Sequence, residues 1–486
     1  MASLLPTSTP SAQDVDARGV LDLLDALERD GHDPHSIVLS RHGQVIARGW
    51  WAPYSPNRIQ LLYSLSKSFA ATAVGLLVDE GRVSLDTPVF NLIPAGDLPD
   101  DATIPERYRR LTLGQCLQMA TGHDTEAWTP GPNEAAYLPT SDGTDPVLAA
   151  ILAHEPEHEP GSAWAYNQIA TYLVAAAVRG VTGGSLLDLL RPRLLERLDP
   201  DSPDAARWHV TATGRELGFS GLHLGTDAVH ALAQTYLDRG RWQGEQLLSE
   251  DWVATATTPT GLPNREEAPN PDWTHGYGCS FWGARLGYRG DGAYGQFAIV
   301  LPEQDIALAI TEETTDMQGV LDLVWEHLVP AVGRPGSADD DAELARRLES
   351  LAVPMPGGSA DGPSQATWTR SPDSTVADSY AAAELTADAG GWSLALEGTD
   401  APIAIGHGQW AGSELVVGAA RLPVVAAGGW QGQDFVAELR LIELPHSLLL
   451  RGRADGSMTL DWHEVPLYGT DPMALAVRFT EGLSQT

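Results

Sequence analysis

The chain contains a single lysine, Lys67, and apart from histidine all its other basic residues are arginines. An arginine guanidinium stays protonated at any accessible pH, whereas a buried lysine amine can lose its proton and act as a base. We therefore expect this one amine to occupy a place where a guanidinium would not serve. It stands near the start of the run 63–81, which is apolar enough to be a core element.

The residues after Lys67 predict a buried helix that ends at Gly81. Ser64 precedes Lys67 by three positions, and side chains three apart on a helix lie on one face and can meet. Free backbone N–H groups and the helix dipole favour a developing anion at such an N-terminus. Ser64 is thus predicted to be a nucleophile activated by Lys67. Because Ser-x-x-Lys is a short pattern, a solvated surface pair is the alternative.

Composition bounds the remaining possibilities. A chain of 486 residues with 43% hydrophobic residues can bury a large core and should contain two or more domains. A net charge of −35 disfavours nucleic acid and anionic membranes as partners. No signal peptide or transmembrane span is recognisable, and only Cys116 and Cys279 could form a disulfide, so a cytoplasmic protein is expected.

The order of elements predicts two domains. A helix near residues 20–27, a hairpin over 36–51, the Ser64 helix, further helices and a strand meander over 277–311 suggest one mixed sheet backed by helices. We expect a flexible lead over 1–15, a catalytic domain over 16–332 and a linker over 333–372. Short β-type runs with glycine turns over 373–486 predict a separate all-β domain.

One metal-binding pattern needs separate consideration. His154-Glu155-Pro156-Glu157-His158 matches H-E-x-x-H, in which two histidines one helical turn apart bind zinc. Pro156 lies inside the motif, and proline interrupts the helix that zinc binding needs. A polar loop is the preferred interpretation, and no metal is expected.

Several motifs together resemble the β-lactamase-related serine hydrolases, which include class C β-lactamases, D-aminopeptidases, esterases and amide hydrolases. They are Tyr63-Ser-Leu-Ser-Lys-Ser-Phe, Met119-Ala-Thr-Gly-His, Pro160-Gly-Ser followed by Tyr166-Asn, and Gly290-Asp-Gly-Ala before a hairpin. The resemblance covers about residues 20–332. It implies an α/β (α+β) fold with an antiparallel sheet flanked by helices, a small-molecule substrate, and no cofactor. The sequence is compatible with a homo-oligomer and does not decide the oligomeric state.

The resemblance also assigns roles. Ser64 would be acylated, Lys67 would accept its proton, and Tyr166 would assist proton transfer to the leaving group. The backbone N–H groups of Ser64 and Ala293 would form the oxyanion hole. As an alternative, Tyr166 is a packed aromatic residue before a helix.

Two departures from the family pattern bear on the substrate. The asparagine usual two residues after the tyrosine is replaced by Gln168, with Asn167 displaced by one. The strand motif, usually Lys-Thr-Gly or His-x-Gly, reads Gly290-Asp291-Gly292, and Arg289 could compensate if its side chain turns inward. Together with the absent signal peptide, these substrate-binding candidates favour a small ester or amide over a β-lactam.

Two other functions are considered. A glycosidase would need two carboxylates flanking the scissile bond, for which Asp291 and the pair Glu312-Glu313 are candidates. A binding or sensor protein would be acylated without turnover, or would do no chemistry. The retained lone lysine argues against a site without chemistry.

Overall fold

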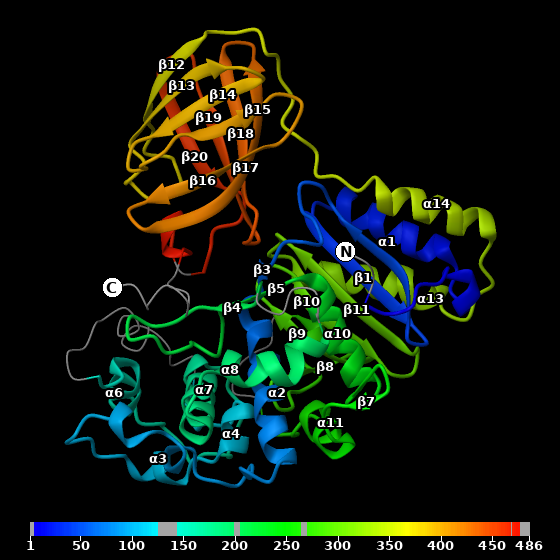
Figure 1. The fold of residues 1–486 in the computed structure, drawn as a ribbon, viewed down its shortest axis with the longest axis vertical. Helices are drawn as coiled ribbons and strands as arrows, with labels where there is room; N and C mark the ends of the chain where they lie inside the picture. The colour runs from blue at the N-terminus through cyan, green and yellow to red at the C-terminus, as the bar shows by residue number, and fades with distance from the viewer. Residues whose placement is uncertain (1–3, 125–142, 199–204, 264–269, 468, 477–486) are drawn as a thin grey trace.

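The computed structural model describes residues 4–124, 143–198, 205–263, 270–467 and 469–476. They form an N-terminal domain, in which helices flank a sheet, and a separate C-terminal β domain (Figure 1). The predicted fold class is confirmed. Residues 477–486, which we expected to belong to the β domain, lie outside the described residues.

A six-stranded sheet with the order β2-β1-β11-β10-β9-β8 organises the N-terminal domain. All its neighbouring strands are antiparallel, so the mixed sheet suggested by the element order was wrong and the antiparallel sheet implied by the resemblance is confirmed. The predicted hairpin and meander join at β1 and β11, where Ile37 faces Ile310. The strands are β1 (Pro34–Arg41), β2 (Gln44–Trp50), β8 (Trp282–Ala284), β9 (Gly287–Gly292), β10 (Gln296–Leu301) and β11 (Ile306–Glu312).

Helices cover both faces of this sheet, so its strands are buried on both sides. Side chains alternate along a strand: Ile37 and Leu39 join the core formed with α1 (Ala17–Arg29), α12 (Met317–Leu323) and α13 (Val329–Ala331). Val38 joins the core on the opposite face, with α10 (Thr226–Leu237).

The helix after Ser64, α2 (Ser66–Asp79), is buried on its whole circumference from Ser66 to Leu77. A helix that is apolar all round must be covered on every side. The helices that pack on it are α7 (Gln168–Thr182), α8 (Leu186–Leu190) and α11 (Glu250–Thr257). The other helices of this region are α3 (Glu106–Arg110), α4 (Leu113–Leu117), α6 (Pro146–Leu152) and α9 (Glu196–Leu198).

Small sheets complete this region: β3 (Gln60–Leu61), β5 (Leu222–Leu224) and β4 (Arg207–Trp208) form one, and β6 (Arg241–Trp242) and β7 (Glu245–Gln246) another. No single described helix meets the length and apolarity needed to cross a membrane, and one bent pair, Gln168–Thr182 with Leu186–Leu198, meets them only when both parts are counted together. Cys116 and Cys279 are buried free thiols.

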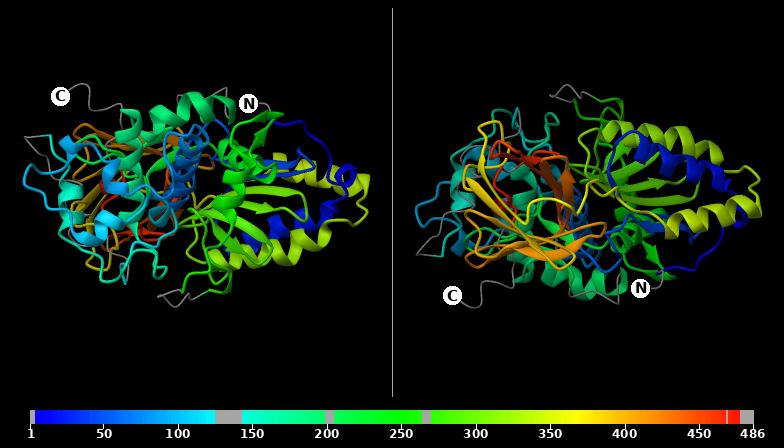
Figure 2. Two further views of the ribbon diagram at one scale, coloured as in Figure 1. Left: turned by 90° about the horizontal axis from the view of Figure 1, so that it is seen from below. Right: turned by 90° about the horizontal axis from the view of Figure 1, so that it is seen from above.

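The expected flexible lead and part of the expected linker pack against the N-terminal domain. Pro6 and Ser8, in the expected flexible lead, exchange backbone hydrogen bonds with Val45 on β2. The first part of the expected linker packs as well: α14 (Ala338–Glu349) lies beside α1 (Figure 2), and Arg18 forms ion pairs with Asp340 and Glu343. Polar composition predicted a spacer here, but these acidic side chains meet a cation on the neighbouring helix. The last part of the expected linker, Gln365–Arg370, is a strand of the C-terminal domain.

The C-terminal domain is a nine-stranded sheet closed by a contact between β15 and β17. Its strand order is β15-β14-β13-β12-β20-β19-β18-β17-β16. The strands are β12 (Gln365–Arg370), β13 (Ala382–Asp388), β14 (Gly391–Leu396), β15 (Ile403–Gly406), β16 (Ala411–Val417), β17 (Ala420–Gln431), β18 (Asp434–Leu441), β19 (His446–Gly452) and β20 (Ser457–Trp462). The closed sheet is filled by apolar side chains, and this core continues onto Tyr63 and Tyr294 of the N-terminal domain.

Candidate active site

Ser64 lies in a 3-10 turn, Tyr63–Leu65, that leads directly into α2. The predicted contact is present: Lys67 Nζ lies 2.9 Å from Ser64 Oγ. Lys67 is only 1% exposed, so the pair is not the solvated surface pair of the alternative interpretation. Burial of an amine within hydrogen-bond distance of a serine hydroxyl is the arrangement that a general base and its nucleophile require.

The lysine amine has a second partner that the sequence did not reveal. Nζ donates a hydrogen bond to the carbonyl oxygen of Phe219 at 2.9 Å. Phe219 lies in the segment before α10, where Gly218 and Gly221 both have positive φ angles. Glycine adopts this left-handed conformation readily, and the segment brings the carbonyl under the amine. Only the three-dimensional path of the chain links a backbone carbonyl 152 positions away to Lys67.

Tyr166 faces this pair from the segment before α7. Lys67 Nζ lies 4.8 Å from the centre of the Tyr166 ring. The ring stacks on Trp282 of β8 with centroids 5.7 Å apart, and Tyr277 meets it edge-on at 6.1 Å. Tyr166 is therefore both packed, as the alternative interpretation supposed, and adjacent to the predicted base. Its predicted role in proton transfer remains a proposal.

Asn167 and Gln168, which follow Tyr166, have different surroundings. Asn167 is fully buried and caps α7: its Oδ1 accepts from Ala170 N at 2.9 Å, and its Nδ2 donates to Thr121 Oγ1 and to Ala165 O. Both amide hydrogens are used within the protein, so the expected substrate-binding role of Asn167 is not supported by this geometry. Gln168 is the first residue of α7 and is 9% exposed, and its substrate contact stays a prediction.

Arg289 and Asp291 form a buried ion pair on β9. Residues two apart on a strand share a face, and Arg289 Nε donates to Asp291 Oδ2 at 3.0 Å. Arg289 turns inward as supposed, but its Nη1 donates to Asp272 O and Gly283 O and the side chain is 0% exposed. It does not replace the family's basic residue as a free cation for a substrate carboxylate.

The environment of Asp291 opposes ionisation in part. Burial raises the pKa of its carboxyl above the usual value, and the charge of Arg289 and hydrogen bonds from Arg289 and Trp282 offset only part of this effect. With Arg289 at hydrogen-bond distance, Asp291 is a paired carboxylate. Its expected contact with a substrate stays a prediction.

The glycines of β9 permit close approach to the Ser64 turn. A Cβ at Gly290 would lie 2.6 Å from Leu65 Cδ1 and from Ser68 Oγ. A Cβ at Gly292 would lie 2.0 Å from the carbonyl oxygen of Leu62. Side chains cannot occupy these spaces, so Gly290 and Gly292 bring the strand against the nucleophile's turn. Ala293 follows directly, and the oxyanion hole between Ser64 and Ala293 stays a prediction.

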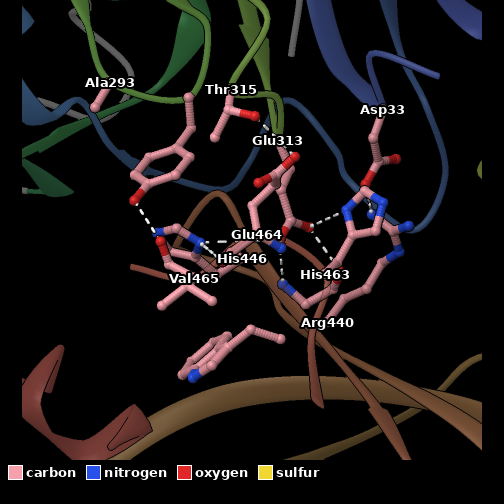
Figure 3. A network of polar contacts seen from close by, with 12 residues as sticks. Asp33, Ala293, Glu313, Thr315, Arg440, His446, His463, Glu464 and Val465 are labelled. Atoms are coloured by element: carbon pink, nitrogen blue, oxygen red, sulfur yellow. Dashed lines mark hydrogen bonds and ion pairs between the residues drawn. The ribbon is translucent and has the colours of Figure 1, made fainter. Parts of the chain in front are cut away.

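The carboxylates proposed for a glycosidase are placed unfavourably. Glu313 accepts hydrogen bonds from Ser447 N and Ser447 Oγ of the C-terminal domain. It also accepts one from Glu464 N, and the two glutamates lie close together in Figure 3. Glu312 is 0% exposed, and burial raises the pKa of its carboxyl well above the usual range. Asp291 is paired with Arg289, so the geometry argues against two carboxylates flanking a sugar.

Metal binding is tested at two places. The His154 region is a loop: α6 ends at Leu152, His154 Nδ1 bonds to Ala150 O, and His158 pairs with Asp124. The expected break of the H-E-x-x-H pattern is confirmed. A second group, Asp33, His35 and Glu313, has ligand atoms within 4.8 Å of one another. Arg440 donates to Asp33 at 2.9 Å, and this cation fits poorly beside a metal ion.

Comparison with known proteins agrees with this geometry. The beta-lactamase family model matches residues 25–327. A 6-aminohexanoate-dimer hydrolase of Paenarthrobacter ureafaciens is 27% identical over 276 residues, which cover 52% of this chain and 67% of that protein.

Two solved structures share the fold. A Bacillus anthracis protein provisionally described as a 6-aminohexanoate-dimer hydrolase has a TM-score of 0.50 at 19% identity, covering 71% of this chain and 88% of its own. The structure of SurE has a TM-score of 0.51 at 18% identity, covering 93% of this chain and 99% of its own. The family match spans more than half of the chain and includes Ser64, Lys67 and Tyr166. The chain therefore belongs to the beta-lactamase family of hydrolases.

Proposed function

We propose that this protein hydrolyses a small ester or amide through an acyl-enzyme intermediate on Ser64. The observation that carries the proposal is the 2.9 Å contact between the buried Lys67 amine and Ser64 Oγ. The relative of 27% identity supports the substrate class, because it is named a hydrolase of 6-aminohexanoate dimer. Such a dimer consists of two amino acids joined by an amide bond.

Acylation begins when Ser64 Oγ attacks the substrate carbonyl carbon. Neutral Lys67 donates one N–H to Phe219 O and takes the Ser64 hydroxyl proton on its lone pair. The carbonyl electron pair moves onto oxygen, and the N–H groups of Ser64 and Ala293 stabilise this anion. The bond to the leaving group then breaks, and the proton on Lys67 reaches the departing alcohol or amine through Tyr166.

Deacylation repeats these steps with water as the nucleophile. Water gives a proton to the base as its oxygen attacks the acyl carbon, and collapse of the second tetrahedral intermediate returns the proton to Ser64 Oγ. The products are a carboxylic acid and the free enzyme. No further reactant is needed.

The aromatic residues near Tyr166 support an apolar or flat acyl group. Trp164, Tyr277 and Trp282 lie within 6.3 Å of the Tyr166 ring, centroid to centroid. These rings are buried and pack on one another, which makes the surroundings of Tyr166 apolar. Because Arg289 is held by Asp291, a substrate carboxylate gains no free cation from this strand, which disfavours β-lactams.

Intact-mass measurement after incubation with a fluorophosphonate tests the proposal. The wild type should gain one phosphonyl group, and Ser64→Ala should gain none. Lys67→Arg should react far more slowly, because a guanidinium does not accept the proton. Unmodified wild type would overturn the proposal. A p-nitrophenyl ester tested in parallel separates turnover from an acylated sensor: a hydrolase releases nitrophenol repeatedly, and a sensor releases one equivalent and keeps the acyl group.

A further inference from the structure

The residues that flank the proposed oxyanion hole share an unusual conformation. Tyr63, which precedes Ser64, has φ 44°, and Tyr294, which follows Ala293, has φ 64°. Both values lie in the left-handed region, which non-glycine residues rarely occupy and which costs roughly 1 kcal/mol or more. Such conformations persist only where the surrounding structure holds them.

The C-terminal domain supplies a hydrogen-bond partner to each tyrosine. Tyr63 OH lies 2.6 Å from Nε2 of His446, the first residue of β19. Tyr294 OH donates to the carbonyl oxygen of Val465 at 2.7 Å (Figure 3). Neither residue of the C-terminal domain is among those that sequence motifs singled out.

Aromatic contacts join the same three side chains. The Tyr63 and Tyr294 rings are 5.1 Å apart, and His446 meets Tyr294 edge-on at 4.5 Å and Tyr63 at 5.8 Å. Tyr63 is 1%, Tyr294 4% and His446 0% exposed. Edge-to-face aromatic pairs have a preferred geometry, so His446 restrains both rings.

His446 is itself held in one tautomer. Its Nδ1 lies 3.2 Å from the carbonyl oxygen of Glu464, and a carbonyl can only accept, so Nδ1 carries the hydrogen. In the neutral ring, Nε2 then accepts the hydrogen bond that the Tyr63 hydroxyl donates. In this neutral state the hydrogen bond runs from the N-terminal domain into the C-terminal domain.

A carboxylate of the catalytic domain fixes the chain around His446. Glu313, directly after β11, accepts from Ser447 N at 3.0 Å and from Glu464 N at 3.2 Å. In addition, Leu61, which lies three residues before Ser64, donates its backbone N–H to Glu443 O at 3.0 Å. The junction therefore holds His446 from both domains.

We propose that His446 is a positioning residue, which acts through Tyr63 and Tyr294 to hold the backbone N–H groups of Ser64 and Ala293 where they bind the oxyanion. In this arrangement the C-terminal domain completes the active site. The inference rests on the proposed function, because it concerns the oxyanion hole of the same reaction.

Tyr63→Phe is the mildest test, because it removes only the hydroxyl, and His446→Phe removes the acceptor and keeps a ring. Each should lower kcat and the rate of Ser64 phosphonylation by about tenfold to a hundredfold. This loss should not exceed the loss that removal of one oxyanion-hole donor causes. KM should change less than about twofold, because a positioning defect acts on the transition state. The double variant should be no slower than the slower single variant, since both remove one bond.

Two further variants separate positioning from stability. His446→Gln can accept from Tyr63 through its side-chain carbonyl and should recover part of the rate. Tyr380→Phe also removes a buried tyrosine hydroxyl of the C-terminal domain, the one that donates to Asp471 at 3.0 Å, and should keep the wild-type rate. Thermal unfolding of every variant identifies losses due to misfolding.

The outcomes are distinct. Labelled wild type with slow Tyr63→Phe and His446→Phe variants supports the proposal. If both variants react at the wild-type rate and only unfold at lower temperature, His446 is structural and the inference is overturned while the proposed function stands. If wild type is not labelled, the proposed function fails and the inference fails with it.

Discussion

Lys67 Nζ lies 2.9 Å from Ser64 Oγ, inside a core that leaves the lysine 1% exposed. Replacement of this lysine by arginine should therefore lower kcat/KM for a p-nitrophenyl ester by about 100-fold to 10,000-fold, the usual contribution of a general base. The measurement is steady-state kinetics. Arg41→Lys, at a partly exposed arginine of β1, exchanges the same two residue types elsewhere and should leave kcat/KM unchanged. Near-wild-type activity of Lys67→Arg would exclude a proton-accepting amine.

Tyr166→Phe should lower kcat by about 100-fold or more with little change in KM, because the hydroxyl acts in proton transfer while the ring still packs on Trp282. Tyr288→Phe removes a hydroxyl that donates to Tyr236 O at 3.0 Å in the same domain. This control should lose about 1 kcal/mol of stability and no activity. Equal kinetics for both variants would leave Tyr166 with a packing role only.

Gly292→Ala should lower both stability and activity. The new Cβ would lie 2.0 Å from Leu62 O, a backbone atom that cannot rotate away, so β9 or the Ser64 turn must shift. We expect a loss of roughly 1–3 kcal/mol in the free energy of unfolding and at least a tenfold loss in kcat, since the proposed oxyanion donors flank this contact. Denaturant unfolding and ester kinetics measure the two effects.

Gly412→Ala is the matched control for that substitution, because nothing lies within 4 Å of the corresponding Cβ on β16. It should be neutral or slightly stabilising. If Gly292→Ala behaves like this control, the close approach of β9 to the Ser64 turn is not needed.

Asp291→Asn should destabilise the protein by about 3–5 kcal/mol, because it leaves the Arg289 guanidinium buried without its carboxylate. Asp340→Asn removes one partner of Arg18 at the surface and should cost less than about 1 kcal/mol. Denaturant unfolding compares the two variants. A stable Asp291→Asn protein with a raised KM would instead show that Asp291 is available to bind substrate.

The contact between the domains should weaken in alkali. A hydrogen bond to Glu313 raises the pKa of His463 from 6.5 to about 9, against the opposing effect of burial. A raised pKa means that the charged histidine contributes its stability below pH 6.5 and loses it as the pH rises through about 9. Its side chain is half exposed, so solvent screens the effect. Wild type should lose more thermal stability between pH 6.5 and pH 9 than His463→Gln does.

In acid, the pair of Glu313 and His463 should weaken through protonation of Glu313. Burial opposes ionisation of Glu313, but hydrogen bonds from His446 and His463 lower its pKa from 4.5 to about 2. A lowered pKa means that the contribution of Glu313 is present above pH 4.5 and is lost as the pH falls toward 2. If His463→Gln and wild type show the same profile over the whole range, this pair does not link the domains.

The sequence by itself determined the contact between Ser64 and Lys67, because residues three apart in a helical turn must meet. It also determined the hairpin, the meander and the all-β C-terminal domain, whose alternating patterns are local. It did not determine that Asn167 is a helix cap or that Arg289 is held by Asp291, because both outcomes depend on which groups fold against them.

Only the tertiary structure decided what surrounds Ser64 and Lys67. The Phe219 carbonyl reaches Lys67 across 152 residues, and His446 reaches Tyr63 across 383. No spacing rule predicts such contacts, since they depend on how whole domains pack. Motifs specify local geometry, whereas the position of an oxyanion hole within a few tenths of an ångström depends on packing from every side.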